Sequence, residues 1–132
     1  MKVLIIEQEK TLQQSLSYFV GRFHNCEVFL VGSGREGISL LESTPIDVVL
    51  CGDRLPDGDG LGVLKELMKQ NPRLISILMT VHGDEVLKQQ AMAAGIRGYL
   101  EKPFNLKELE EIIILSNPLS DKGEEEGFHE RR

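Results

Sequence analysis

Five short apolar runs alternate with amphipathic segments along the first 116 residues of the chain. Each run holds five or six residues, and several are apolar almost throughout, which is typical of parallel strands buried on both faces. The strands predicted from this pattern are residues 2–6, 26–31, 46–51, 74–79 and 97–101.

The segments between the strands carry apolar residues at the three-to-four spacing of one helix face. They predict five helices, over residues 12–23, 38–41, 61–68, 86–94 and 105–115. Gly95 is suited to a left-handed helix end, and Asn105 is a good N-terminal cap. Because strands and helices alternate with short connections, the sequence predicts an α/β fold in which a parallel sheet is covered by helices on both faces.

Composition limits the function classes. The 132 residues suit one domain, predicted over 1–116, while 117–132 are predicted to be an acidic tail or linker stub. A net charge of −6 argues against direct nucleic-acid binding, which needs clustered basic residues. No apolar run is long enough for a membrane span, and two cysteines are too few for a disulfide framework. We therefore expect a cytoplasmic protein with reduced thiols.

Candidate chemistry is expected in the loops that follow the strands, because ligands of such sheets bind outside the carboxyl ends of the strands. Residues 32–37 fit the phosphate-binding pattern G-x-G-x-x-G, but this pattern normally opens the first strand–helix unit and here opens the second. We interpret it as a turn, and expect no nucleotide cofactor. No Ser-His-Asp or Cys-His constellation is supported by spacing, so enzyme activity is not expected.

Four of these strand ends carry motifs in a recognisable order: LIIEQEK, DVVLCGDRLPDGDG, ILMTVHGDE and GYLEKPFN. Together they resemble the receiver domain of bacterial two-component response regulators, over residues 2 to about 116. The resemblance implies a flavodoxin-like, doubly wound sheet of five parallel strands in the order 2-1-3-4-5 with five helices. It also implies a phosphorelay, in which a histidine kinase transfers a phosphoryl group to an aspartate that helps to hold Mg²⁺.

Several site residues match the motifs of that family. The resemblance makes Thr80 and Lys102 the phosphoryl-contacting pair. It also makes Thr80 and the aromatic Tyr99 the switch residues that move with activation. Glu7 and Gln8 occupy the positions of the family's metal-binding acidic pair. Because Gln8 is neutral, one expected metal-binding carboxylate has become an amide.

The acceptor aspartate is missing. In the family it lies four residues before the turn proline and five after the acid that opens the strand; counting from Pro56 and from Asp47 both lead to Gly52. Asp53 is the nearest substitute, but successive strand residues point to opposite faces. We therefore expect Asp53 to be a solvated loop acid, unless a bulge at Gly52 turns its carboxylate into the site.

This leaves Glu7 and Lys102 as the charged groups at the site, with Asp53 a doubtful third. We expect weak or absent Mg²⁺ binding, and a direct Glu7–Lys102 ion pair in place of the metal. The hypothesis is an atypical receiver that is fixed in one state without phosphorylation. Two alternatives stay open: a phosphorylatable receiver that uses Asp53, and a sensor that binds a small ligand in the emptied pocket.

The expected work of such a domain is protein–protein contact that regulates an output such as transcription. In the family, the fourth helix, fifth strand and fifth helix form the face that makes a homodimer or docks an output domain or partner protein. The candidate charged contacts on this face are Arg97, Lys107, Glu108 and Glu111. Whether a histidine kinase is a partner stays open, because Gly52 cannot accept a phosphoryl group.

Overall fold

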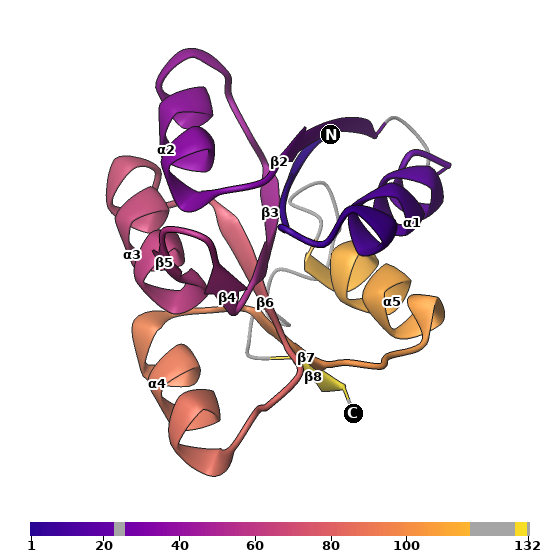
Figure 1. Ribbon diagram of the computed structural model, residues 1–132, viewed down its shortest axis with the longest axis vertical. Helices are drawn as coiled ribbons and strands as arrows, with labels where there is room; N and C mark the ends of the chain where they lie inside the picture. Colours follow the sequence, from indigo (N-terminus) through magenta and orange to yellow (C-terminus); the bar gives the residue numbers. More distant parts are fainter. Residues whose placement is uncertain (23–25, 117–128, 132) are drawn as a thin grey trace.

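A computed structural model describes residues 1–22, 26–116 and 129–131. Its main sheet has the order β2-β1-β3-β6-β7-β8, and all neighbouring strands are parallel (Figure 1). The strands are β1 (Lys2–Ile6), β2 (Glu27–Val31), β3 (Val48–Gly52), β6 (Ile75–Thr80), β7 (Gly98–Glu101) and β8 (His129–Arg131). The first five confirm the predicted strands and their predicted order.

Five helices cover the two faces of this sheet. They are α1 (Lys10–Val20), α2 (Gly34–Ser43), α3 (Gly60–Gln70), α4 (Glu85–Ala94) and α5 (Leu106–Ser116). Figure 1 shows α1 and α5 on one face and α2, α3 and α4 on the other. Each face has its own apolar core: Leu64 and Ala91 belong to one, and Leu16 and Ile112 to the other. The doubly wound α/β fold expected from the sequence is confirmed.

Local signals fix the ends of α4 and α5 as expected, whereas the start of α2 differs from the prediction. Gly95 ends α4 in the left-handed conformation, with φ of 92°, which a residue without a side chain adopts at little cost. Asn105 accepts a hydrogen bond through Oδ1 from the backbone N–H of Lys107, at 2.7 Å. The second helix begins at Gly34, earlier than the predicted residue 38, because Ser33 caps it by accepting from the N–H of Glu36.

The loop between β3 and α3 holds a small antiparallel ladder that the sequence analysis did not predict. It pairs β4 (Arg54–Leu55) with β5 (Gly58–Asp59). Gly58 has φ of 151°, a conformation that favours glycine. Two-residue strands leave no apolar alternation to detect, so the pattern that reveals longer strands is absent here.

Two of the predicted segments extend beyond the residues that the structure describes. The predicted first helix extends to Phe23, which lies outside the described residues, and the helix itself ends at Val20. Of the predicted tail, residues 117–128 and 132 lie outside them, while residues 129–131 form β8, a strand that was not expected. Within the described part of the chain, no helix combines the length and apolar character needed to cross a bilayer.

Candidate functional site

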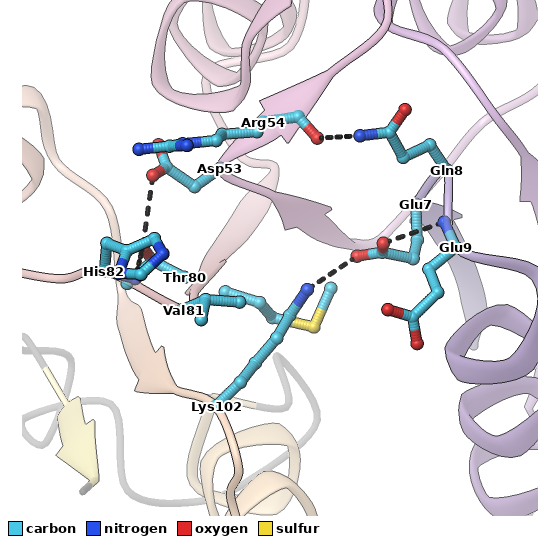
Figure 2. A pocket seen from close by; sticks show the side chains of 10 residues that line it. Glu7, Gln8, Glu9, Asp53, Arg54, Thr80, Val81, His82 and Lys102 are labelled. Atoms are coloured by element: carbon cyan, nitrogen blue, oxygen red, sulfur yellow. Dashed lines mark hydrogen bonds and ion pairs between the residues drawn. The ribbon is translucent and has the colours of Figure 1, made fainter.

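A cavity of about 240 Å³ lies where β1, β3, β6 and β7 end. Its lining includes most of the residues predicted for the site, and Figure 2 shows them converging from these separate strand ends. Lining residues with polar side chains include Glu7, Gln8, Asp53, Thr80, His82 and Lys102. The fold therefore brings together residues that are up to 95 positions apart in the sequence.

Glu7 and Lys102 form an ion pair at the base of this cavity. Lys102 Nζ lies 3.1 Å from Glu7 Oε1, and the other carboxylate oxygen accepts from the backbone N–H of Glu9 at 3.0 Å (Figure 2). Glu7 is only 3% exposed. A buried carboxylate is costly without partners, and here both of its oxygens have one. The ion pair expected from the sequence is present.

Gly52 leaves the space that this carboxylate occupies. The residue ends β3 and is paired with Met79 of β6, so its backbone is fixed by the sheet. A Cβ atom added at Gly52 would lie 2.7 Å from Glu7 Oε1, closer than two such atoms approach in proteins. Position 52, where the family has its acceptor, thus faces the Glu7 carboxylate directly.

The side chain of Gln8 makes a hydrogen bond to the loop between β3 and α3. Its Nε2 donates to the backbone oxygen of Arg54 at 3.2 Å, linking the end of β1 to β4. The amide nitrogen is a donor and cannot be a metal ligand in this arrangement, so Gln8 does not replace the missing carboxylate through this atom. The second position of the acidic pair is therefore engaged with the β3–α3 loop.

The residues at this site do not fit the Mg²⁺ that the receiver resemblance implies. Mg²⁺ requires several hard oxygen ligands in octahedral geometry. Here one oxygen of Glu7 is bound to an ammonium group, position 8 is an amide, and position 52 has no side chain. Among the residues that the structure describes, no three His, Cys, Asp or Glu side chains are grouped so that they could hold a metal ion.

Asp53 differs from the expectation of a solvated loop acid. It is half-buried, and its Oδ2 accepts a hydrogen bond from Thr80 Oγ1 at 3.1 Å. Thr80 Oγ1 in turn accepts from the backbone N–H of His82 at 3.2 Å. The backbone N–H of Asp53 donates to the carbonyl oxygen of Met79 at 2.7 Å, which extends the β3–β6 pairing. Asp53 thus lines the same cavity as Glu7, from the opposite wall.

Tyr99 lies below the loop that follows β6. It is 1% exposed, and a Cβ added at Gly83 would overlap its hydroxyl group. Gly83 therefore makes room for the inward position of this side chain. The sequence analysis missed Gly83, although a glycine three residues after Thr80 was a signal that something approaches the loop closely.

The N-terminus of α2 is closed by Asp57. This carboxylate accepts from the backbone N–H groups of Gly34 and Arg35, at 3.0 and 2.9 Å. These hydrogen bonds lower the pKa of Asp57, because they stabilise its charged form. The same backbone groups would have to bind phosphate if residues 32–37 formed a nucleotide site. Their occupation agrees with the interpretation of this segment as a turn.

The four charged residues predicted for a contact face lie away from the cavity, on α5 and just before β7. Lys107 and Glu111 are exposed, whereas Arg97 and Glu108 are half-buried. Apolar side chains are also exposed on the neighbouring helix α4: Val86 is 65% exposed and Met92 is 51% exposed.

Comparison with known proteins gives a consistent result. The model of the response regulator receiver domain family matches residues 3–114. The chain is 29% identical over 125 residues to the response regulator protein PilR of Pseudomonas aeruginosa, and this match covers 95% of the chain and 28% of PilR. It is 38% identical over 76 residues to the DNA-binding transcriptional regulator NtrC of Salmonella typhimurium, covering 58% of the chain and 16% of that protein.

The fold is shared with solved structures as well. A two-component response regulator from Clostridium difficile matches with a TM-score of 0.83 and 27% identity, over 91% of this chain and 99% of that one. The chain spans less than a third of the length of PilR and of NtrC.

Proposed function

Because the chain belongs to the family of response regulator receiver domains, we propose that it is a cytoplasmic signalling module that works without phosphorylation. Its output is regulated through protein–protein contacts rather than through catalysis. Control of transcription is the output that fits the similarity to NtrC, a DNA-binding transcriptional regulator.

One observation carries this proposal. The carboxylate of Glu7 fills the space in front of Gly52 and is bound to Lys102, the cation that contacts the phosphoryl group in this family. Phosphoryl transfer needs an acceptor oxygen together with cationic stabilisation of the charge that spreads over the transferred group. Position 52 has no side chain to supply the acceptor oxygen, and the Lys102 ammonium is paired with Glu7.

The neighbouring residues support a pocket held in one state. Thr80 and Tyr99 are both 1% exposed, and Thr80 is hydrogen-bonded to Asp53 and to the backbone of His82. Gly83 accommodates the inward side chain of Tyr99. In a standard receiver these two residues change position when the acceptor is phosphorylated; here their contacts are made by the unmodified chain.

The face formed by α4, β7 and α5 supports protein contact. Val86 and Met92 expose apolar surface on α4, and Lys107 and Glu111 add charges of opposite sign on α5. Apolar surface next to charged groups is characteristic of contact sites. We propose that this face makes a homodimer or docks an output domain or partner protein, with Arg97 and Glu108 at its half-buried part.

Asp53 supports a second candidate function, a receiver that is phosphorylated at this residue. Its carboxylate lines the cavity and is hydrogen-bonded to Thr80, the residue expected to contact the phosphoryl group. Lys102, however, pairs with Glu7, so the cation that the transfer requires is engaged elsewhere. This weakens the Asp53 candidate relative to a phosphorylation-independent module.

The deciding experiment is an amide NMR titration of residues 1–132 with Mg²⁺ and then with beryllofluoride, a mimic of the acyl phosphate. We expect the resonances of Thr80, Lys102 and Tyr99 to stay unchanged. The positive control is the variant Gln8→Asp/Gly52→Asp, which restores the family's carboxylates in the same fold. In this variant we expect Mg²⁺-dependent shifts at those three residues.

The opposite result in the natural chain would overturn the proposal. If beryllofluoride shifts Thr80 and Lys102, and Asp53→Asn abolishes these shifts, the domain is a phosphorylation switch that uses Asp53. If the shifts survive Asp53→Asn, another group in the cavity binds the phosphoryl mimic, and the proposal fails as well.

A further inference from the structure

The loop between β6 and α4, residues 81–84, buries little surface of its own. Val81 is 58% exposed, and the side chain of His82 is exposed as well. Of the residues of α4, all of which the structure describes, only Ala91 is buried. Segments with little buried apolar surface are the ones that change position most readily. The position of the β6–α4 loop therefore depends on the polar contacts that its neighbours make with it.

Thr80, the last residue of β6, connects this loop to the wall of the cavity. Its hydroxyl group donates to Asp53 Oδ2 at 3.1 Å and accepts from the backbone N–H of His82 at 3.2 Å (Figure 2). Two partners therefore orient this hydroxyl group, and hydrogen bonds in such a chain strengthen one another. Thr80 is only 1% exposed, so water does not readily replace Asp53 as the acceptor. Asp53 thus acts on the backbone of the loop through a single side chain.

The same loop lies against Tyr99. A Cβ atom added at Gly83 would overlap the hydroxyl group of Tyr99 and would lie 2.9 Å from Cγ2 of Thr80. The backbone at Gly83 is therefore packed against the end of the Tyr99 ring. Tyr99 is 1% exposed with the loop in this position, so a displacement of the loop would change the exposure of its hydroxyl group.

We propose that Asp53 is the positioning residue that holds the β6–α4 loop over Tyr99 in the unmodified chain. Its carboxylate orients the Thr80 hydroxyl group, Thr80 fixes the backbone at His82, and the loop then covers the end of the Tyr99 ring. Loss of the carboxylate releases the loop, and Tyr99 becomes more exposed. The inference rests on the proposed function, because it names the group that keeps the pocket in one state without phosphorylation.

The test compares three substitutions in the full chain. Asp53→Ala removes the acceptor of the Thr80 hydroxyl group, whereas Asp53→Asn keeps an oxygen that can accept the same hydrogen bond. Glu9→Ala is the matched control, because it also removes one carboxylate from the lining of the cavity. The side chain of Glu9 makes no capping hydrogen bond at the start of α1, so its loss leaves that helix end as it is.

Two rates are measured in each protein. Hydrogen exchange of the His82 amide reports on its bond to Thr80, and the Leu78 amide inside β6 is the reference for the stability of the whole domain. Acetylation by N-acetylimidazole, located by peptide mass spectrometry, reports on the exposure of the Tyr99 hydroxyl group. Tyr18, which is 70% exposed, is the internal reference for this reaction.

In Asp53→Ala, we expect the His82 amide to exchange about fivefold faster or more, which is the size of effect that one hydrogen bond gives. We expect the acetylation of Tyr99 to accelerate by a similar factor, while the two reference groups stay unchanged. Asp53→Asn and Glu9→Ala should both keep the rates of the natural chain to within about twofold, because each retains an acceptor for the Thr80 hydroxyl group.

A further variant, Thr80→Val, tests the route between Asp53 and the loop. It keeps the size of the side chain and removes the hydroxyl group, so it should accelerate both rates by itself. Adding Asp53→Ala to this variant should change neither rate further, because the carboxylate acts through the hydroxyl group that is already missing.

Unchanged His82 exchange or unchanged Tyr99 acetylation in Asp53→Ala overturns the inference. Equal acceleration in Asp53→Asn or Glu9→Ala also overturns it, because the cause would then be the loss of a negative charge. A further effect of Asp53→Ala in the Thr80→Val chain would show that Asp53 acts by another route. These measurements use no phosphoryl mimic, so the proposed function is tested separately, by the beryllofluoride titration.

Discussion

Glu7 and Asp57 are two carboxylates at the same end of the sheet whose charge is balanced in different ways. Glu7 is 3% exposed and pairs with the side chain of Lys102, which comes from a strand end on the other side of the cavity. Asp57 is exposed and accepts from two backbone N–H groups at the start of α2. One depends on a second charged side chain, and the other depends only on the backbone.

The difference follows from solvent access. A carboxylate taken out of water requires a counter-charge and hydrogen bonds, so the loss of either partner is costly. An exposed carboxylate keeps most of its hydration, and a helix N-terminus adds only a modest stabilisation. The buried pair therefore lies in the wall of the cavity, while Asp57 attaches the β3–α3 loop to the N-terminus of α2.

The largest effect is expected from Lys102→Met, which leaves the buried Glu7 carboxylate without its counter-charge. Breaking a buried ion pair on one side destabilises a protein by about 3 kcal/mol or more. Urea unfolding measures the change. The double variant Glu7→Gln/Lys102→Met should recover most of the lost stability, and Lys65→Met, at an exposed helix position, should have little effect. Equal stability of the Lys102 and Lys65 variants would contradict the difference between buried and exposed charge.

A smaller loss of stability is expected from Gly52→Ala, which disturbs the Glu7–Lys102 pair without removing a charge. The added methyl group would lie 2.7 Å from Glu7 Oε1 and displace the carboxylate from Lys102. We expect a loss of about 1–2 kcal/mol in the free energy of unfolding, as for other overpacked buried sites. Gly32→Ala is the control, since its nearest neighbour would be 3.8 Å away. If Gly52→Ala left the free energy of unfolding unchanged, the Glu7 carboxylate would be able to move aside without cost.

The effect of Asp57→Asn on stability should depend on pH. Because the pKa of Asp57 is lowered in the folded state, its charge stabilises the fold above the ordinary value of 3.8, and this contribution is lost as pH falls through the lowered pKa. The difference in unfolding free energy between the natural chain and the variant should be constant near neutral pH and shrink on acidification. Unfolding curves at a series of pH values measure it, with Glu42→Gln as the control for loss of one acid. If the difference in unfolding free energy between the two proteins grew toward low pH, it would contradict a lowered pKa of Asp57 in the folded state.

The smallest effect is expected in the labelling of Cys51, the residue directly before Gly52, by a thiol reagent. Its side chain is 0% exposed, and its Sγ is 3.4 Å from the backbone oxygen of Gly52. Burial raises the pKa of this thiol, so the reactive thiolate is scarce. A thiol reagent should label only the half-buried Cys26 in the folded protein and both cysteines in urea. Rapid labelling of Cys51 in the folded state would show that the apolar core between β3 and α3 opens to solvent.

Much of the fold could be predicted because the signals are local. Runs such as Val48–Gly52 are apolar throughout because they are covered on both faces. This pattern can be recognised in the sequence without knowing which strands lie beside the run. The prediction that position 52 holds no acceptor also came from counting, because Pro56 and Asp47 both lead to Gly52. The pairing of Glu7 with Lys102 could be anticipated once their charges were placed at adjacent strand ends.

Other features were missed because no local pattern encodes them. The β4–β5 ladder is too short for alternation, and β8 lies in a segment whose composition predicts a tail. Asp53 was expected to be a solvated loop acid, but it is half-buried and accepts a hydrogen bond from Thr80. Its carboxylate lines the same cavity as Glu7, which the alternation of side chains along a strand did not indicate.

The sequence by itself determined the order of strands and helices and the family, and it led to the prediction that position 52 holds no acceptor, since each depends on residue type and spacing along the chain. Only the tertiary structure decided that Glu7 occupies the space before Gly52, that Asp53 reaches Thr80, and that a C-terminal strand lies on β7. These contacts join residues that are 27 to 95 positions apart or depend on which sheet edge is open. Such distances are set by packing in three dimensions, which no local pattern contains.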